Sequence, residues 1–378
     1  MLFVTNKYRY NKNMEKLTHS KLLEAISHFE IDGNVINIEE NHNGHINDTF
    51  VVTAENEEKK RTRYIVQRIN SNVFPNVKNV MFNIQEVLSF MRKKVADNQG
   101  DLSKEVLTLI PTKNKASYFE DEEGSFFRTY LYLEDSLSYN QTTSPEVFGA
   151  SGRAFGKFQR DLNGFDAAKL FEVIPNFHNT PKRYQDFLKA LSLASEERKE
   201  EAKEEIKWAK ENQYISEFLS GKNIPLRVTH NDTKLNNVLF FEGSNKTCVI
   251  DLDTIMPGYS LYDFGDSIRF GANEAKEDEK DLNKVKLSLT FFKAYLDGYM
   301  EGAGETLTKE EIALFPEAGM LMTYECGIRF LTDFLNGDTY FKISYPNHNL
   351  VRAKDQFALV EDMKKKLPQM RELVKEYL

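Results

Sequence analysis

The chain has 378 residues, of which 40% are hydrophobic and 12% aromatic, and its formal net charge is −8. This length suffices for two domains or one large bilobal domain. The acidic balance excludes a general nucleic-acid binder, which needs a basic excess. Two cysteines, Cys248 and Cys326, cannot form a disulfide framework and indicate a reducing, cytoplasmic compartment. No apolar run reaches the length of a membrane span, so we expect no membrane association.

Strand patterns dominate residues 1–135, after an N-terminal extension at 1–18 that lacks the apolar core of a signal peptide. The runs 51–53 and 64–69 flank the polar stretch AENEEKKRTR, which predicts a β-hairpin. Apolar residues then recur every three or four positions across 77–91, which predicts a helix with one buried face. Two further strands are predicted at residues 105–110 and 125–133. Together these elements predict a small N-terminal lobe with an antiparallel sheet and one main helix.

Helical patterns dominate residues 136–378. Ser144 followed by Pro145 is a good helix start, because serine caps the helix and proline fits its first turn. The charged run EERKEEAKEEIKWAKEN has helical spacing and predicts a solvated helix face. More helices are predicted over the stretches 284–300, 309–335 and 353–376. The predicted fold is therefore α+β and bilobal, with a large, mainly helical C-terminal lobe, which is the layout of protein-kinase-like folds.

The stretch THNDTKLNNVLF (residues 229–240) places many polar groups directly before a strand. It contains His-x-Asp-x4-Asn, with Asp232 and Asn237, and a second strand nearby delivers Asp251. Phosphoryl transfer needs an Asp near the attacking hydroxyl, and an Asn and an Asp that hold Mg²⁺ against the nucleotide phosphates. A polar turn is the alternative for the first motif alone. The strand-end carboxylate that follows favours a kinase site that uses ATP and Mg²⁺.

Three stretches resemble the N-acetylhexosamine 1-kinases of the aminoglycoside phosphotransferase and choline kinase-like superfamily: THNDTKLNNVLF, CVIDLDTIMPGYSLYDFGDSIRFGAN and TYECGIRFLTDFLNGDTYFKISYPNHNLVR. The stretches NGHINDTF and YIVQRIN are similar to the nucleotide-binding lobe of the same family. The resemblance implies that residues 1–135 bind the nucleotide and that residues 136–378 carry catalysis and sugar binding. It also implies Asp232 as the catalytic base and Asn237 and Asp251 as the metal ligands.

The resemblance further implies that His45, Arg329 and Tyr340 contact the sugar together with Asp232. Each has a plainer alternative: His45 as a loop residue, Arg329 as an ion-pair partner and Tyr340 as core. Lys234 either neutralises charge on the transferring phosphoryl group or is a loop lysine in solvent. We expect the basic residues near the polar turns of the C-terminal part, such as Arg329, Lys342 and Arg352, to disfavour a polycationic acceptor.

The nucleotide side departs from the protein-kinase pattern, in which a strand lysine faces the phosphates. The corresponding strand offers Gln67 with Arg68 beside it, and the resembled family also has Gln there. We expect adenine to dock against the backbone of residues 129–133, which include Tyr130 and Leu131. In the string DFGD, we expect the two aspartates to brace the catalytic loop and cap the following helix.

The predicted function is ATP- and Mg²⁺-dependent phosphorylation of the anomeric hydroxyl of N-acetylglucosamine or N-acetylgalactosamine by a cytoplasmic monomer. One alternative is a kinase of another small sugar or of an amino-alcohol. The other alternative is an inactive nucleotide-binding module, against which intact Asp232, Asn237 and Asp251 argue.

Overall fold

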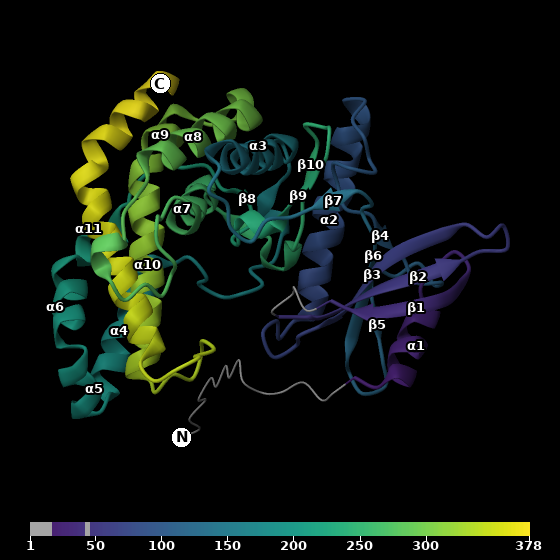
Figure 1. The fold of residues 1–378 in the computed structure, drawn as a ribbon, viewed down its shortest axis with the longest axis horizontal. Helices are drawn as coiled ribbons and strands as arrows, with labels where there is room; N and C mark the ends of the chain where they lie inside the picture. Colours follow the sequence, from purple (N-terminus) through teal and green to yellow (C-terminus); the bar gives the residue numbers. More distant parts are fainter. Residues whose placement is uncertain (1–16, 42–45) are drawn as a thin grey trace. The chain divides into compact units, whose positions relative to one another are not determined.

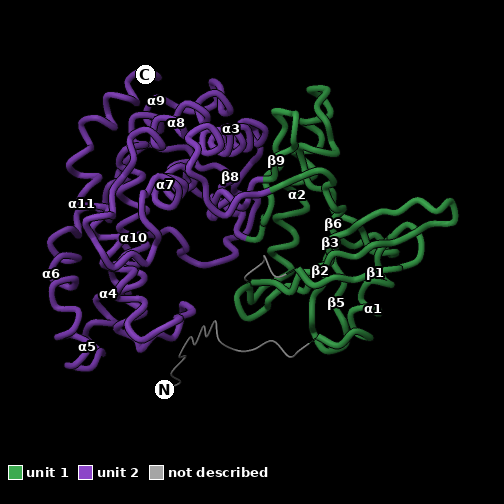
Figure 2. Tube along the Cα trace, viewed as in Figure 1, with its two compact units in different colours: residues 1–137, 239–253 green, residues 138–238, 254–378 purple. Residues whose placement is uncertain are grey.

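The computed structural model describes residues 17–41 and 46–378 of the chain. Its contacts divide the chain into two compact units, coloured separately in Figure 2. Unit 1 comprises Met1–Leu137 and Leu239–Asp253, and unit 2 comprises Ser138–Val238 and Thr254–Leu378. The segment Leu239–Asp253, which follows the catalytic motif, therefore packs with the N-terminal part of the chain.

Unit 1 is built around an antiparallel sheet with the strand order β1-β2-β3-β6-β4, in which β5 also pairs with β6. Its elements in chain order (Figure 1) are α1 (His19–Ser27), β1 (Asn34–Glu40), β2 (Asp48–Glu55), β3 (Arg61–Ile69), α2 (Val77–Asp97), β4 (Leu109–Ile110), β5 (Phe119–Glu120), β6 (Phe126–Leu131), β7 (Ser136–Leu137), β9 (Val238–Phe241) and β10 (Thr247–Val249).

The predicted hairpin is confirmed as β2 and β3, which pair antiparallel with Val52 opposite Tyr64. Side chains alternate between the two faces of a strand, and Val52, Ala54, Tyr64 and Val66 fall on the buried face. The predicted helix is confirmed as α2, whose apolar face is buried.

Parts of unit 1 differ from expectation. Neither α1 nor β1 is predicted from the sequence, and the strand expected at 105–110 is reduced to β4. Glu105 accepts a hydrogen bond from the backbone N–H of Asp101 at 2.7 Å and from Lys246 at 2.9 Å. The backbone N–H of Glu105 also donates to the carbonyl oxygen of Asp101 at 2.9 Å, which closes a turn over residues 101–105 and takes this donor away from strand pairing.

The two strands predicted between the catalytic motif and Asp251 are confirmed as β9 and β10, which belong to a three-stranded sheet in the order β10-β9-β7. In this sheet β7 pairs antiparallel with β9, with Leu137 opposite Phe240. The chain leaves β10 into Asp251 with a φ of 60°, a left-handed conformation that Asp tolerates better than most residues. Asp251 is exposed there.

Unit 2 is mainly helical, as predicted. Its elements in chain order are α3 (Pro145–Asp161), α4 (Thr180–Leu193), α5 (Glu196–Glu201), α6 (Lys203–Glu211), β8 (Arg227–Thr229), β11 (Met256–Gly258), α7 (Ser260–Gly271), α8 (Leu289–Ala303), α9 (Lys309–Ala313), α10 (Phe315–Leu335) and α11 (His348–Val374). The predicted cap at Ser144 is confirmed, since its side chain accepts the N–H of Val147. The short strands β8 and β11 pair antiparallel and frame the catalytic loop.

Helices α3 and α8 pack with their backbones in close contact. At Gly298 an added Cβ would lie 1.9 Å from the carbonyl oxygen of Gly149. Only glycine permits such an approach, so this packing fixes the helices on one side of the catalytic loop.

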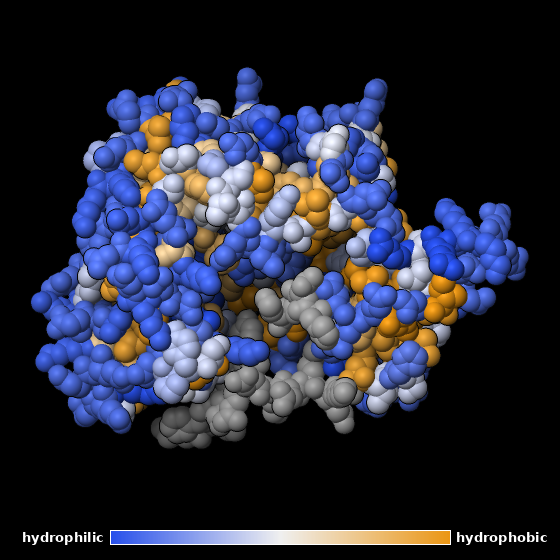
Figure 3. All heavy atoms as spheres, viewed as in Figure 1, coloured by the Kyte–Doolittle hydropathy of each residue, from blue (hydrophilic) through white to orange (hydrophobic). Residues whose placement is uncertain are grey.

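The charged run near residue 200 forms two helices, α5 and α6, which meet at buried Ala202. Figure 3 shows a mostly hydrophilic surface over these helices, which agrees with the predicted solvated face. Among the described residues, no helix has the length and apolar content that a membrane span requires.

Candidate active site

The catalytic loop runs from β8 through the short 3-10 turn Leu235–Asn237 into β9. Asn231 holds a left-handed backbone with a φ of 64°. Its side-chain amide donates to the carbonyl oxygens of Thr229 at 3.2 Å and Thr254 at 2.8 Å. Asn is one of the few residues that adopt this conformation at low cost, and the two bonds lock it. The loop therefore has a fixed bend immediately before Asp232.

Asp263, on α7, braces the same bend. Its two carboxylate oxygens accept the backbone N–H groups of His230 at 2.9 Å and of Asn231 at 2.8 Å. Thr233 adds a third link by donating its hydroxyl to the Asp263 carbonyl at 2.7 Å. Burial raises the pKa of Asp263, although His230 and the two N–H donors oppose this rise. The expected bracing role of Asp263 is confirmed, but the expected helix cap is wrong, because Asp263 and Asp266 lie inside α7 and its N-cap residue is Tyr259.

Asp232 lies at the tip of this braced loop, and its side chain is 26% exposed. One carboxylate oxygen is 2.7 Å from Nζ of Lys234, and the other accepts a hydrogen bond from Nδ2 of Asn237 at 3.1 Å. The same Nδ2 also donates to the Asp232 carbonyl at 2.8 Å. The three residues that the sequence predicts for catalysis and metal binding in this loop thus lie in direct contact.

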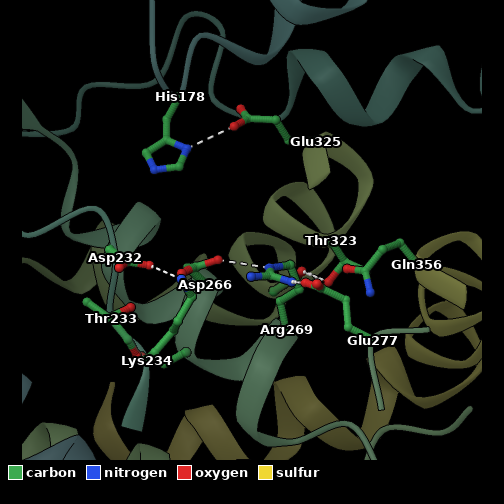
Figure 4. Close-up of polar contacts among 12 residues, drawn as sticks. His178, Asp232, Thr233, Lys234, Asp266, Arg269, Glu277, Thr323, Glu325 and Gln356 are labelled. Atoms are coloured by element: carbon green, nitrogen blue, oxygen red, sulfur yellow. Dashed lines mark hydrogen bonds and ion pairs between the residues drawn. The ribbon is translucent and has the colours of Figure 1, made fainter. Parts of the chain in front are cut away.

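Lys234 belongs to a wider charge network, shown in Figure 4. The carboxylate of Asp232 raises the pKa of Lys234 above its usual value, with a smaller contribution from Asp266. Asp266 pairs with Arg269 at 2.8 Å, and Arg269 pairs with Glu277 at 2.8 Å. Burial alone would raise the pKa of Asp266, but Arg269 and Lys234 bring it below the usual value. Lys234 is therefore a cation held beside Asp232, rather than a lysine free in solvent.

The chain offers oxygen ligands for a cation at two predicted positions. Asn237, in unit 2, donates through Nδ2 to both the carbonyl and the carboxylate of Asp232, which leaves its Oδ1 as an oxygen ligand for a metal. Asp251, in unit 1, presents an exposed carboxylate. Hard oxygen donors of these kinds fit Mg²⁺, which also takes phosphate oxygens and water. Within residues 17–41 and 46–378, no cluster of three or more His, Cys, Asp or Glu side chains forms a separate metal site.

Arg128 on β6 is a charged residue that the sequence analysis missed. In the sheet register it lies opposite Gln67, and its Nε donates to Gln67 Oε1 at 2.9 Å. Its guanidinium also pairs with Asp253, and both side chains are almost fully buried. Burial would lower the pKa of Arg128, but Asp253 raises it overall, with a further contribution from Asp251. A cation thus stands beside Gln67, where protein kinases place a lysine.

The other residues predicted to bind the nucleotide are Arg68, Tyr130 and Leu131. Arg68 pairs with Asp48, so its charge is already compensated. Tyr130 is buried, and burial raises the pKa of its hydroxyl to about 12. The backbone N–H of Leu131 donates to the carbonyl of Thr108 at 2.9 Å. A docked base must therefore use other backbone groups of the 129–133 stretch than this N–H.

The predicted sugar-binding residues Arg329 and Tyr340 lie in the same region of unit 2. The guanidinium of Arg329 lies over the ring of Phe177, 5.2 Å from its centroid. Burial lowers the pKa of Arg183, and the nearby charge of Arg329 lowers it further, while Tyr340 acts in the opposite direction. The third predicted residue, His45, lies outside the described residues.

Comparison with known proteins places these features in a family. Residues 37–304 match the phosphotransferase enzyme family. An aminoglycoside phosphotransferase from Alicyclobacillus acidocaldarius has 12% identity and a TM-score of 0.63, over 97% of this chain and 99% of that one. A microcompartment-associated aminopropanol kinase has 14% identity and a TM-score of 0.61, over 93% and 98% of the two chains.

An amicoumacin kinase solved with AMP-PNP and Ca²⁺ has 11% identity and a TM-score of 0.53, over 95% of this chain and 94% of that one. These solved structures confirm the predicted α+β fold of the protein-kinase-like type. The family match extends over most of the chain, including the catalytic loop and the β9–β10 hairpin. The chain belongs to the phosphotransferase enzyme family.

Proposed function

We propose that this phosphotransferase transfers the γ-phosphoryl group of ATP to the anomeric hydroxyl of an N-acetylhexosamine, giving the sugar 1-phosphate and ADP. The observation that carries the proposal is the braced loop that presents Asp232 between Lys234 and Asn237. Phosphoryl transfer depends on positioning and on charge stabilisation more than on covalent chemistry. A partly exposed carboxylate on a rigid loop suits the orientation and deprotonation of a hydroxyl.

Each neighbour of Asp232 has a distinct role in this proposal. Lys234 would neutralise charge that develops on the transferring group, because the contact with Asp232 keeps it cationic. Magnesium, held by the oxygens of Asn237 and Asp251 as the sequence predicts, would offset the charge of the phosphates.

The acceptor assignment is supported by the charges around Arg329. Arg183 and Arg329 lie close enough for one charge to lower the pKa of the other group. The Glu325 carboxylate offsets part of this charge, but two guanidinium groups in one region still disfavour a cationic acceptor such as an aminoglycoside or an amino-alcohol. They suit hydroxyl and carbonyl oxygens, to which guanidinium N–H groups donate. Phe177, below Arg329, adds an apolar surface of the kind an acetyl methyl group can contact.

The direct test is a panel of acceptors incubated with ATP and Mg²⁺. The panel contains N-acetylglucosamine, N-acetylgalactosamine, the parent hexoses, choline, ethanolamine, aminopropanol and homoserine. We expect ADP release with the N-acetylhexosamines, and a sugar 1-phosphate signal in phosphorus NMR. Transfer confined to the amino-alcohols would refute the acceptor assignment, and no transfer to any acceptor would favour the inactive module.

Asp232→Asn tests the catalytic assignment. The amide keeps the size of the side chain but loses the charge that pairs with Lys234 and the ability to take a proton. Positioned acid–base groups contribute about 10²–10⁴ in rate, so we expect kcat to fall by that order while the KM for ATP stays near wild type. A variant that keeps more than about a tenth of kcat, with chemistry rate-limiting, would show that Asp232 is not the base.

A further inference from the structure

Unit 2 contains a pocket of about 450 Å³ beside the catalytic loop. Its walls come from the loop 172–181, the turn 216–222 and strand β11. Asn231, the residue before Asp232, also lines it, as do His178 and Tyr262. This volume falls within the range of small-molecule sites. One wall of the pocket is therefore formed by the residue that precedes the proposed base in the sequence.

His178 forms a buried pair with Glu325 at this pocket. The Nδ1 atom of His178 lies 2.8 Å from one carboxylate oxygen of Glu325, and Thr180 donates its hydroxyl to the other oxygen at 2.6 Å. Burial would raise the pKa of Glu325, but His178, together with Arg329 and Thr180, brings it below the usual value. An ionised carboxylate only accepts hydrogen bonds, so Nδ1 must carry the proton. In neutral imidazole, Nε2 is then the hydrogen-bond acceptor.

The Nε2 atom of His178 has no hydrogen-bond partner among the described residues, although it is buried. The whole residue is 8% exposed. The rings of Phe177 and Tyr262 lie 4.4 and 5.2 Å from the imidazole, measured between centroids, and hold its orientation. In Figure 4 the edge of the His178 ring that carries Nε2 faces away from Glu325. This edge is on the side of the ring toward Asp232.

An unsatisfied polar atom of this kind is destabilising, and buried polar groups in proteins are nearly always paired. The cost is recovered when a ligand supplies the missing donor. An ordered water would also supply this donor. The decisive measurement is therefore whether the KM for the acceptor depends on Nε2 of His178.

We propose that the pocket lined by Asn231, His178 and Tyr262 binds the acceptor, and that Nε2 of His178 accepts a hydrogen bond from one of its hydroxyl or amide N–H groups. This inference rests on the proposed kinase function and makes His178 a specificity-determining residue. Glu325 is a positioning residue, because it fixes the imidazole tautomer without touching the acceptor. The pair thus selects acceptors that carry a hydrogen-bond donor at one defined position.

His178→Asn is the sharpest variant, because the Asn amide can occupy the place of Nδ1–H and keep the bond to Glu325 while it removes Nε2. We expect the KM for the acceptor to rise roughly tenfold to hundredfold. The KM for ATP should change by less than about twofold, since the pocket belongs to the acceptor side of the reaction. His348→Asn is the matched control, because His348 is also a buried histidine beside a carboxylate, that of Asp278, but does not line the pocket. It should leave both constants unchanged.

Glu325→Gln provides an independent variant of similar size. The Gln amide can donate to Nδ1, which moves the imidazole proton to Nε2 and turns the acceptor atom into a donor. We expect an increase in acceptor KM like that of His178→Asn, with thermal unfolding monitored to confirm that both variants are folded. Wild-type acceptor KM in folded His178→Asn, or an equal rise in the KM for ATP, would overturn the proposal.

Acceptor analogues that each lack one hydroxyl or the amide N–H identify the partner of Nε2. With the wild type, the analogue that lacks the partner of Nε2 should have a kcat/KM about tenfold or more below that of the full acceptor. With His178→Asn the two compounds should differ little, because the variant already lacks the same hydrogen bond. Additive losses for every analogue would mean that Nε2 binds water and would refute the proposal. If the panel shows that wild type uses another acceptor, the sugar assignment fails alone, and the same comparison with analogues of that acceptor tests His178.

Discussion

Arg128→Met perturbs a charge pair that is almost fully buried in unit 1. The side chains of Arg128 and Asp253 are 1% and 4% exposed. Methionine fills much of the same volume, but it leaves the Asp253 carboxylate in the interior without its cation. Within the described part of the chain, the hydrogen bond that then remains to this carboxylate comes from Nδ2 of Asn47, at 2.6 Å to the other oxygen.

The expected cost follows from this burial. Removal of one partner of a buried ion pair typically costs about 3–5 kcal/mol, because the remaining charge is uncompensated. We expect urea unfolding to show a loss of that size in the free energy of unfolding of unit 1. Replacement of both charges, in Arg128→Met with Asp253→Asn, should recover more than about half of the loss, because a neutral amide is cheaper to bury than a carboxylate.

Two outcomes would refute the reasoning. A loss below about 1 kcal/mol for the single variant would mean that Asp253 takes a proton or reaches water at little cost. A double variant no more stable than the single one would mean that Arg128 acts through packing, not through charge. Arg128→Lys separates the two effects further, since it keeps the charge but gives up the forked geometry that bonds Gln67 and Asp253 together.

Three more predictions follow from the site and its surroundings. Excess chelator should abolish turnover, and added Mg²⁺ or Mn²⁺ should restore it; full activity with chelator present would remove Asn237 and Asp251 as metal ligands. Arg329→Ala should raise the acceptor KM by roughly tenfold to hundredfold with little change in the KM for ATP; unfolding, or an equal rise in both constants, would make Arg329 a structural residue. Burial raises the pKa of Asp355 to about 7. A folded-state pKa above the unfolded value means that the folded protein binds the proton more tightly, so this group should destabilise the fold increasingly as pH rises from about 4 to 7. In urea unfolding, the free energy of unfolding of Asp355→Asn should therefore rise relative to that of wild type by about 1–3 kcal/mol between pH 5 and pH 8. Parallel plots of this free energy against pH for the two proteins would contradict the prediction.

Local patterns predicted the parts of the fold that local physics determines. The β2–β3 hairpin and the α2 helix follow from alternating and helical periodicities of apolar residues, each confined to about twenty residues. The strand expected at 105–110 is shortened because Glu105 closes a local turn with Asp101, through its side chain and through its backbone N–H. Propensity does not register that kind of competition.

Long-range partners escaped the sequence analysis for a different reason. His178 and Glu325 are 147 residues apart, and each is unremarkable in its own segment.

Arg128 carried a weak signal that could have been used. In an antiparallel pair of the two predicted strands, a register that sets Arg128 against Gln67 brings two polar side chains together, and such cross-strand pairs tend to interact.

The polar stretch at residues 229–237 shows why chemistry and folding are encoded in the same few positions. Thr229, His230, Asn231 and Thr233 are almost fully buried, whereas the side chain of Asp232 is 26% exposed. Several of the buried polar groups bond to α7 or to the segment before it, and these bonds offset the cost of burial. An apolar loop could enter the core more cheaply, but it could not hold a left-handed bend at residue 231 with two side-chain bonds. The polar residues around Asp232 therefore serve to hold one carboxylate at a fixed position, and substitutions among them should lower kcat through misplacement of Asp232 even where they never touch a substrate.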